Sequence, residues 1–260
     1  MNGAGAEGSG PYDGSGPYDG EGEGRYDGEG EGRYDGEGGG PYDGGGAPAA
    51  PRRERSATMI ADTPESWEVV ESRPRFKGHV IEVVTDTVRM PRDEVADRDY
   101  VVHPGAVAVL ALDEHDRVLM IRQYRHPTRR LMWELPAGLR DVEGEPLVDT
   151  AARELAEEAG YRAGVWHTLV DLRSSPGMSD ERIRVFLARE LTKIPDEENG
   201  FVHRHEEIDM PVEWVHLADA VEKALMGMIH NSPAVAGILA AYAASVEGYS
   251  LLRPADAPEA

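Results

Sequence analysis

Residues 147–159, LVDTAARELAEEA, constrain the fold of this chain more than any other stretch. Alanine, leucine and glutamate dominate the segment, and these residues favour a helix. Pro146 precedes the segment and Gly160 follows it, which predicts where the helix begins and ends. The apolar side chains that recur at the spacing of one buried helical face are Val148, Ala151, Ala152, Leu155 and Ala159.

Three carboxylates share another face of this predicted helix. Glu154, Glu157 and Glu158 are three or four residues apart, or adjacent, which makes them neighbours on a helical surface. Like charges at this spacing destabilise a helix by about 0.2–0.5 kcal/mol per pair, and Arg153 offsets only part of that cost. A hard divalent cation takes oxygen ligands and would compensate the remaining charge. The alternative is a solvated acidic face without a ligand.

The residues around the helix resemble the signature of the Nudix hydrolases. Gly138, Glu145 and the run RELAEEAGY at 153–161 follow the order of the Nudix box, a loop–helix–loop that binds magnesium and presents a diphosphate in that family. Six residues separate Gly138 from Glu145, one more than the usual five, so the loop departs from the strict pattern. The resemblance covers about residues 65–248. It implies an α/β Nudix fold, a mixed β-sheet between helices with a small N-terminal β-layer.

The resemblance also assigns a metal site. The implied ligands are the carboxylates of Glu154, Glu157 and Glu158 and the backbone carbonyl of Ala137, which stands just before the first glycine of the box. Mg²⁺ is the implied cofactor, and Mn²⁺ is the alternative.

Two arginines and a tryptophan match substrate contacts of the ADP-ribose pyrophosphatase branch. Arg125 ends a QYR segment that supplies an arginine to the substrate phosphates in such proteins, and Arg98 matches a second arginine ahead of the HPGAV strand. A guanidinium fork can meet two phosphate oxygens at once. Trp67 is the implied adenine platform. The alternatives are ordinary surface positions for the arginines and a sheet interface for the tryptophan.

A catalytic base is implied outside the box. Nudix ADP-ribose hydrolases carry a catalytic glutamate on a loop ahead of the last strand, and HEEID at 205–209 stands at that place. We take Glu207 as the base and Glu206 as the second candidate, with two solvated loop acids as the alternative. Glu181, in the SPGMSDE segment, is a candidate for a water-mediated metal contact or for capping.

The remaining chain predicts strands followed by two helices. Expected strands are 67–70 and 78–90, separated by a break at Pro74, then the apolar second half of 98–112, and 117–124, 165–172, 182–188 and 211–215. Expected helices are 218–226 and 232–245. The second helix should cover the sheet with Ala234, Ile238, Leu239 and Tyr242. The tail from Arg253 should be frayed.

Residues 1–50 differ in composition from everything that follows. Tyr-Asp-Gly recurs at 12–14, 18–20, 26–28, 34–36 and 42–44, with glycine and acidic residues between the repeats. Such a segment cannot bury enough apolar surface to offset its ordering entropy, so it predicts disorder. A solubilising tail is the simplest interpretation, and partner binding or phosphorylation at the tyrosines is the alternative. The expected domains are a tail and linker 1–64, a Nudix domain 65–248 with its box at 138–161, and a C-terminal tail 249–260.

Composition excludes several partners. A net charge of −22 argues against general affinity for nucleic acid. The absence of cysteine excludes disulfides and thiolate metal sites. We expect no membrane partner and a cytoplasmic location, because no apolar run approaches the roughly 20 residues needed to span a bilayer and no secretory signal is apparent. The family resemblance implies a homodimer.

These observations predict an enzyme. The expected reaction is Mg²⁺-dependent hydrolysis of the diphosphate of ADP-ribose to AMP and ribose 5-phosphate, or of a similar nucleoside diphosphate sugar. The metal would acidify a bound water, and Glu207 would take or orient its proton. The alternative is a non-catalytic Nudix module that binds a nucleotide as a sensor or regulator, although the intact ligand glutamates argue against it. An interaction protein built around the acidic repeats is the weaker third interpretation.

Overall fold

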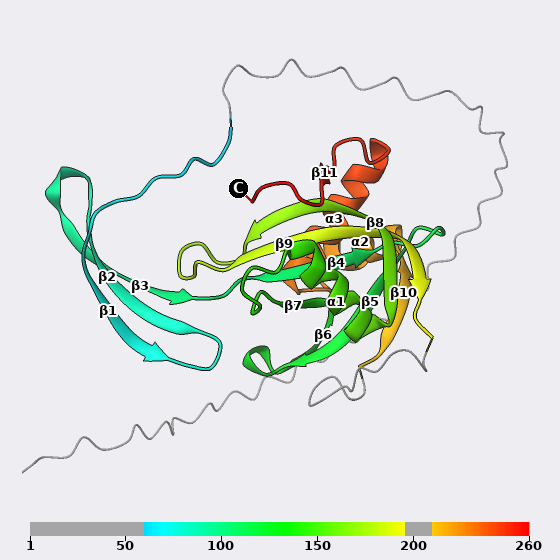
Figure 1. The fold of residues 1–260 in the computed structure, drawn as a ribbon, viewed down its shortest axis with the longest axis horizontal. Helices are drawn as coiled ribbons and strands as arrows, with labels where there is room; N and C mark the ends of the chain where they lie inside the picture. Colours follow the sequence, from blue (N-terminus) through cyan, green and yellow to red (C-terminus); the bar gives the residue numbers. More distant parts are fainter. Residues whose placement is uncertain (1–59, 196–209, 260) are drawn as a thin grey trace, which may run out of the picture. The chain divides into compact units, whose positions relative to one another are not determined.

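The computed structural model describes residues 60–195 and 210–259 (Figure 1). The chain divides into two units, Met1–Ala61 and Asp62–Ala260, and the described residues fall almost entirely in the second. The predicted disordered repeats and the predicted catalytic residues Glu206 and Glu207 lie outside the described residues. No helix within the described ranges is long and apolar enough to cross a bilayer.

Strands make up most of the regular structure, and helices follow them at intervals along the chain. The strands are β1 (Val69–Lys77), β2 (Glu82–Arg89), β3 (Val95–Val102), β4 (Ala106–Ala111), β5 (Arg117–Arg125), β6 (Arg130–Glu134), β7 (Ala137–Leu139), β8 (Tyr161–Arg173), β9 (Arg182–Lys193), β10 (Val212–His216) and β11 (Arg253–Pro254). The α-helices are α1 (Leu147–Ala159), α2 (Leu217–Leu225) and α3 (Ser232–Val246). Short 3-10 helices cover Pro91–Asp93 and His126–Thr128.

A five-stranded mixed sheet, in the order β11-β8-β9-β4-β7, forms the centre of the fold. Its middle strands β4 and β9 run parallel. The apolar run of β4 is buried on both faces, because Val107 and Val109 belong to one core cluster while Ala108 and Leu110 belong to the other. A strand that is apolar on both faces is typical of a sheet covered by helices on both sides.

Helices supply the two covering layers. Ala151 and Leu155 of α1 pack in the same cluster as Val107, and Ile238 of α3 packs in the same cluster as Leu110. The predicted mixed sheet between helices is therefore confirmed. Tyr242 is 46% exposed, so the prediction that it covers the sheet is wrong. The buried positions of α3 are Ala234, Gly237, Ile238, Ala241 and Ala244.

A second sheet, in the order β10-β5-β6, stands beside the first. Along β5 the faces alternate, with Leu119 and Ile121 in one cluster and Met120 in the other. After β4 the chain turns back into β5, which pairs with β6 and β10. An isolated bridge between Leu112, just after β4, and Val118 of β5 links the two sheets. The next segment therefore crosses from β6 in the second sheet to β7 in the first.

The N-terminal β-layer is a three-stranded antiparallel sheet, β1-β2-β3. The prediction that Pro74 breaks the first strand is wrong, because β1 continues through it. Proline lacks an N–H donor and is tolerated at the edge of a sheet, which is the place of β1, and the pairing register shifts just after it. Residues 78–81 form the hairpin turn instead of the start of a strand, with the Gly78 N–H donating to the Ile81 carbonyl at 2.8 Å.

The C-terminal residues also form more regular structure than predicted. Arg253 and Pro254 form β11, which pairs antiparallel with Thr168 and His167 of β8 (Figure 1). The Thr168 hydroxyl donates to the Pro254 carbonyl at 2.9 Å. The prediction of a frayed tail from Arg253 is therefore wrong for residues 253–259.

Candidate active site

Helix α1 presents its carboxylates because its opposite face is buried. The helix spans Leu147–Ala159 as predicted and ends at Gly160, which adopts a left-handed backbone with φ 71°. Ala151 and Leu155 anchor it to the sheet. This packing directs Glu154 toward β7.

The contact between Glu154 and β7 depends on glycine. A Cβ at residue 138 would overlap Cδ and Oε1 of Glu154, so only glycine lets the carboxylate lie directly against this backbone. Burial raises the pKa of Glu154, while the neighbouring Arg153 guanidinium acts in the opposite direction. A partly buried carboxylate with a raised pKa gains from a nearby cation.

Glu158 holds the same strand from the next turn of the helix. Its Oε2 accepts a hydrogen bond from the backbone N–H of Ala137 at 2.8 Å. β7 is an edge strand, and its bonds to β4 are made by the residues on either side of Ala137, for example from the Val109 N–H to the Pro136 carbonyl at 2.8 Å. In an antiparallel pair the intervening residue turns both its N–H and its C=O outward. The Ala137 carbonyl therefore lies on the same side as its N–H, the side of α1.

Arg153 forms ion pairs with the surrounding carboxylates. Its Nη1 lies 2.7 Å from Oε1 of Glu154 and 3.6 Å from Oε2 of Glu157, and its Nη2 lies 3.3 Å from Oε2 of Glu145. The Thr150 hydroxyl also donates to Glu145, and these contacts lower the pKa of Glu145. Nη2 of Arg153 also lies 3.9 Å from Oδ1 of Asp141, so the guanidinium compensates four carboxylates.

The potential metal ligands around Arg153 are of the chemical type that a divalent cation binds. Among residues 60–195 and 210–259, no three acidic or histidine side chains converge tightly enough to hold a metal by themselves. Glu154 and Glu157 turn toward Arg153, and Glu158 turns toward the Ala137 N–H. Even so, the Arg153 guanidinium already lies among these carboxylates. Gly138 has no side chain, so the Glu154 carboxylate lies directly against the backbone there. The available donors are all oxygen atoms, which is the set that Mg²⁺ prefers, so these residues fit such an ion.

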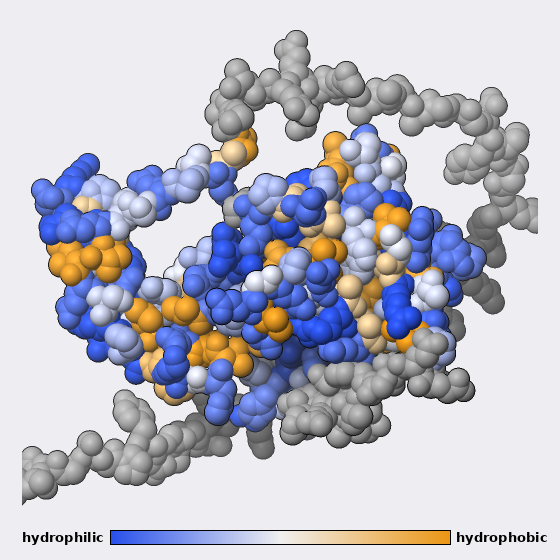
Figure 2. Space-filling model, in the orientation of Figure 1, coloured by the Kyte–Doolittle hydropathy of each residue, from blue (hydrophilic) through white to orange (hydrophobic). Residues whose placement is uncertain are grey.

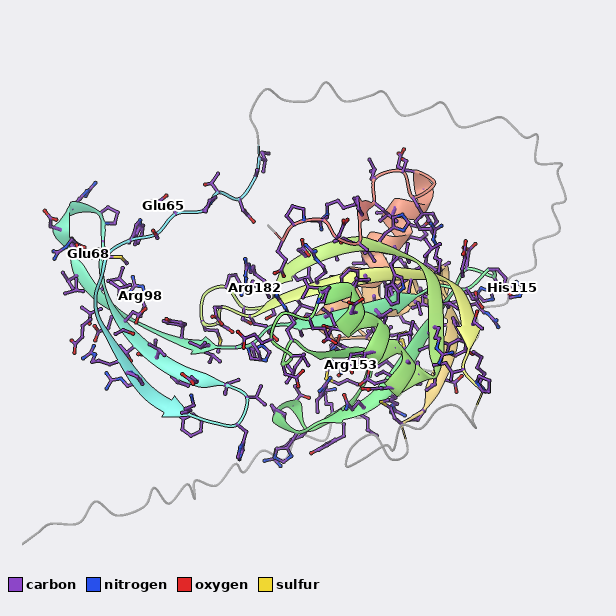
Figure 3. All side chains as sticks on the ribbon, viewed as in Figure 1. Glu65, Glu68, Arg98, His115, Arg153 and Arg182 are labelled. Atoms are coloured by element: carbon purple, nitrogen blue, oxygen red, sulfur yellow. The ribbon has the colours of Figure 1, made fainter. Side chains whose placement is uncertain are left out.

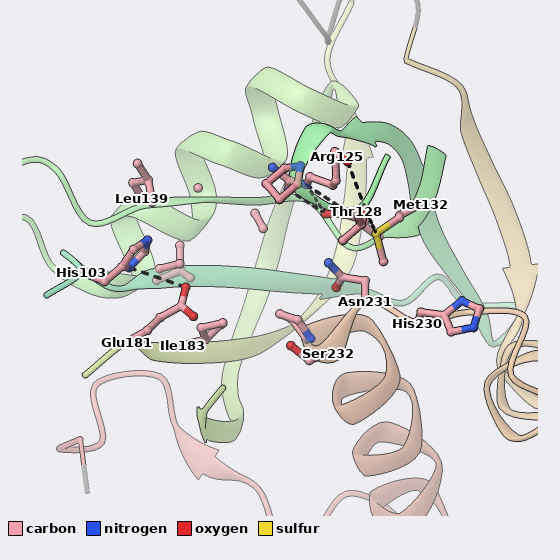
Figure 4. Close-up of a pocket in the computed structure, with 17 residues that line it drawn as sticks. His103, Arg125, Thr128, Met132, Leu139, Glu181, Ile183, His230, Asn231 and Ser232 are labelled. Carbon is pink, nitrogen blue, oxygen red and sulfur yellow. Dashed lines mark hydrogen bonds and ion pairs between the residues drawn. The ribbon is translucent and has the colours of Figure 1, made fainter. Parts of the chain in front are cut away.

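A cavity of about 510 Å³ adjoins this cluster (Figure 4). Its lining includes Ala137 and Gly138 of β7, Arg125 of β5, and Asn231 and Ser232 at the start of α3. The structure therefore brings the predicted phosphate-binding arginine to the same cavity as the backbone beside the predicted metal ligands.

Arg125 is held in this cavity by a buried carboxylate. Its Nη2 donates to Oε2 of Glu134 at 2.7 Å, and its Nε lies 3.0 Å from Oε1. Glu134 is only 1% exposed, so the guanidinium is a close partner for a buried carboxylate. The sequence interpretation gave Glu134 no role. The signal that could have found it is an acid flanked by Trp133 and Leu135 in an otherwise apolar stretch.

The opposite wall of the cavity contains His103 and Glu181 (Figure 4). The Gly105 N–H donates to Nδ1 of His103 at 3.0 Å, and this nitrogen lies 3.6 Å from Oε1 of Glu181. The Ser174 hydroxyl donates to the other oxygen of Glu181. Glu181 therefore lies in the cavity wall, where the sequence left its role open between a metal contact and capping.

Comparisons with known proteins identify the family of this chain. A family model described as NUDIX domain matches residues 102–235. An ADP-ribose pyrophosphatase of Mycobacterium tuberculosis is 44% identical over 190 residues, which cover 73% of this chain and 89% of that protein. The chain belongs to the Nudix hydrolase family.

Two further comparisons agree with this assignment. An ADP-ribose pyrophosphatase of Bacillus subtilis is 40% identical over 121 residues, covering 46% of this chain and 65% of that protein. A crystal structure of an ADP compounds hydrolase has the same fold, with a TM-score of 0.58 at 18% identity, over 73% of this chain and 99% of the other. This Nudix protein is a hydrolase that resembles the ADP-ribose pyrophosphatase branch.

The other predicted substrate residues of this Nudix hydrolase lie elsewhere in the chain. Trp67 and Arg98 line a separate cavity of about 490 Å³ on the β1-β2-β3 sheet, and the Trp67 indole N–H donates to Glu65 at 2.9 Å. Figure 3 shows Arg98 on that sheet beside Glu68, whereas Arg153 lies on α1. Within one chain, the structure therefore does not place Trp67 or Arg98 in the cavity that contains Arg125.

Proposed function

We propose that this Nudix hydrolase cleaves the diphosphate of ADP-ribose, giving AMP and ribose 5-phosphate, or cleaves a similar nucleoside diphosphate sugar. The observation that carries the proposal is the joint anchoring of β7 by Glu154 and Glu158 at a cavity that also holds Arg125. The 44% identity to an ADP-ribose pyrophosphatase over most of its length supports the choice of substrate.

We assign the metal to the face of α1 toward β7. Glu154, Glu157, Glu158 and the Ala137 carbonyl would hold Mg²⁺, with Mn²⁺ as the alternative. When bound, a divalent cation neutralises diphosphate oxygens and lowers the pKa of a coordinated water. Arg125 would contribute a fixed guanidinium to the phosphates, with its orientation set by Glu134.

The attacking water loses a proton in this reaction, and a base has to accept it. The water oxygen forms a bond to one phosphorus, the bond from that phosphorus to the bridging oxygen breaks, and the bridging oxygen leaves with the other phosphate. Glu207 would accept the proton that the water loses, with Glu206 as the second candidate. A positioned general base of this kind contributes about 10²–10⁴-fold to the rate.

The first test is release of AMP from ADP-ribose with Mg²⁺. We expect rapid turnover by the wild type and its collapse in Glu158→Gln. Glu143→Gln is the matched control, because Glu143 is an exposed acid in the loop before α1. Unchanged turnover in Glu158→Gln would refute the metal assignment. An inactive wild type would refute ADP-ribose as the substrate and lead to a panel of other nucleoside diphosphate sugars.

Isotope labelling then identifies the phosphorus that is attacked. In water enriched in ¹⁸O, the label enters AMP if attack occurs at the adenosyl phosphorus and enters ribose 5-phosphate if it occurs at the other. Either result is consistent with diphosphate hydrolysis. Label in neither product would contradict water as the nucleophile.

We also propose a homodimer formed through the β1-β2-β3 sheet. Apolar side chains are exposed on this layer, including Trp67, Val69, Phe76 and Val95 (Figure 2). A second copy would cover them and could bring Trp67 and Arg98 to an adenosine group. Light scattering should give twice the mass of one chain, and Phe76→Asp should shift the mass toward that of one chain. A monomeric wild type would contradict this part of the proposal.

The remaining expectations concern the whole chain. We propose a tail and linker at 1–64, a Nudix domain at 65–248 and a cytoplasmic enzyme. Removing residues 1–50 should leave hydrolysis unchanged, because the proposed site uses none of them. A loss of turnover in that variant would contradict the proposed division into domains.

A further inference from the structure

The segment 253–259 packs against the sheet next to the loop that precedes α1. It begins at β11, where Arg253 donates from Nη1 to Oδ2 of Asp171 at 2.9 Å. Ala255 packs against the core cluster that also contains Leu155. The segment is therefore fixed at its start by backbone pairing, by an ion pair and by apolar contact.

A buried arginine holds the middle of the segment. Arg184 of β9 is 2% exposed and forks onto Asp171, with Nε 2.7 Å from Oδ1 and Nη2 3.0 Å from Oδ2. Its remaining donors reach the backbone carbonyls of Ala257 at 2.6 Å and Pro258 at 3.1 Å. A buried guanidinium needs a hydrogen-bond acceptor for each of its donors. Residues 257 and 258 supply acceptors in addition to the Asp171 carboxylate.

The end of the segment reaches the active-site loop. Oε1 of Glu259 lies 3.0 Å from Nη1 of Arg140, and its Oε2 lies 4.0 Å from Nη1 of Arg182 at the start of β9. The side chains of Glu259 and Arg140 are 25% and 23% exposed, so this pair is better shielded from solvent than a typical surface ion pair.

Arg140 is the point at which the loop leaves the sheet. Its N–H donates to the Gly105 carbonyl at 3.1 Å. Gly105 has φ 88°, and a Cβ there would lie 3.1 Å from Cδ of Arg140, so the side chain is confined on that side. Arg140 stands two residues after Gly138, the residue against which Glu154 packs.

The loop beyond Arg140 has few other anchors. Residues 141–144 are all exposed. Oδ1 of Asp141 lies 3.9 Å from Nη2 of Arg153, and Glu145 is tied to Arg153 and Thr150. An exposed loop held by a few contacts depends on each of them for its position. Glu259 is one of the groups that fix the first end.

We propose that Glu259 is a positioning residue of this hydrolase, which acts through Arg140 to hold residues 139–146 and thereby the backbone at Gly138 against Glu154. The role in hydrolysis rests on the proposed function, whereas the role in ordering the loop does not. A simple surface ion pair would stabilise the chain slightly and would leave this loop unaffected.

Hydrogen exchange of the metal-free full-length protein tests the proposal without using activity. We expect Glu259→Gln to speed exchange of peptides covering 139–146 by about three- to tenfold, with peptides covering 182–193 unchanged. Asp256→Asn is the matched control, because it removes one carboxylate from an exposed position of the same segment. Unchanged loop exchange in Glu259→Gln, or an equal increase in Asp256→Asn, would overturn the proposal.

A charge swap tests the pair itself. Arg140→Glu combined with Glu259→Arg should restore slow exchange in the loop, whereas either single variant should not. Failure of the double variant to restore it would show that the pair does not carry the effect. In parallel, Glu259→Gln should lower kcat about three- to tenfold with little change in the melting temperature. If no ADP-ribose hydrolysis is found, the proposed function fails while the exchange result still decides the role of Glu259 in ordering the loop.

Discussion

The carboxylate of Glu154 occupies the space that a side chain at residue 138 would fill. The two residues are 16 positions apart in the chain, and the contact joins the middle of α1 to the edge strand β7. Helix and strand are thereby set against each other at the place where we assign the metal. The absence of a Cβ at residue 138 is consequently a requirement of the site.

Gly138→Ala should therefore abolish turnover. The added methyl group must displace Glu154 or β7, and overpacking of this kind costs about 1–3 kcal/mol of stability. Turnover and thermal unfolding should be measured together. Gly177→Ala is the control, since a Cβ there would meet no atom within 4 Å, and it should change neither quantity appreciably. An active Gly138→Ala enzyme would show that Glu154 need not lie against this strand.

Removing Arg125 should impair both binding and stability. Arg125→Ala takes the guanidinium away from the buried carboxylate of Glu134, which should lower the free energy of unfolding by about 1–3 kcal/mol. The loss is smaller than for a fully buried pair, because the Arg125 side chain is 44% exposed. KM should rise at the same time. Adding Glu134→Gln should recover part of the stability and none of the affinity. Recovery of KM in the double variant would contradict a substrate contact by Arg125.

Glu206 and Glu207 should differ in their effect on kcat. Glu207→Gln should lower kcat by about 10²–10⁴-fold, because a general base is lost, while Glu206→Gln should have a much smaller effect. The pH profile of kcat provides the second readout, since the acidic limb should disappear only with the residue that accepts the proton. The opposite order of effects would make Glu206 the base.

Acid should weaken the attachment of segment 253–259 through Asp171. Burial alone would raise the pKa of Asp171, but hydrogen bonds from Arg184 and Arg253 outweigh it and leave the pKa lowered. The folded protein then binds this proton less tightly than the unfolded chain. Its contribution to stability is full above the unfolded pKa of about 3.9 and is lost as pH falls through the folded value.

Thermal unfolding of wild type and Asp171→Asn between pH 3 and 7 checks this expectation. Asp171→Asn should be less stable by about 2–4 kcal/mol near neutral pH, because Arg184 is left buried with a weaker partner. The difference should shrink as the pH falls below about 4. A difference that is constant over this range would contradict the lowered pKa.

Local patterns predicted much of the fold. The bounds of α1 follow from its composition, Pro146 and Gly160, because helix propensity and termination act over neighbouring residues. The burial of β4 on both faces follows from its uninterrupted apolar run. The predicted metal ligands of α1 share one face because residues three and four apart are neighbours on any helix.

The wrong or missing predictions concern residues whose structure depends on a partner far away in the chain. Pro74 does not end β1, since an edge strand leaves its missing N–H without consequence. Residues 253–259 look polar and short by themselves, yet they pack because Arg184, about 70 residues earlier, needs their carbonyls. Glu134 received no role because nothing near it in the chain indicates that Arg125 will lie opposite.

Short-range spacing in the chain was enough to determine the helix α1, the apolar strands and the box residues that identify the family, because each depends on neighbours within about ten residues. Which distant groups meet was decided by the tertiary structure. It paired Arg125 with Glu134, brought Glu259 to Arg140, and kept Trp67 and Arg98 in a cavity apart from Arg125. These relations depend on strand register and on how sheets pack, and a one-residue shift in register would reverse the face on which each side chain lies.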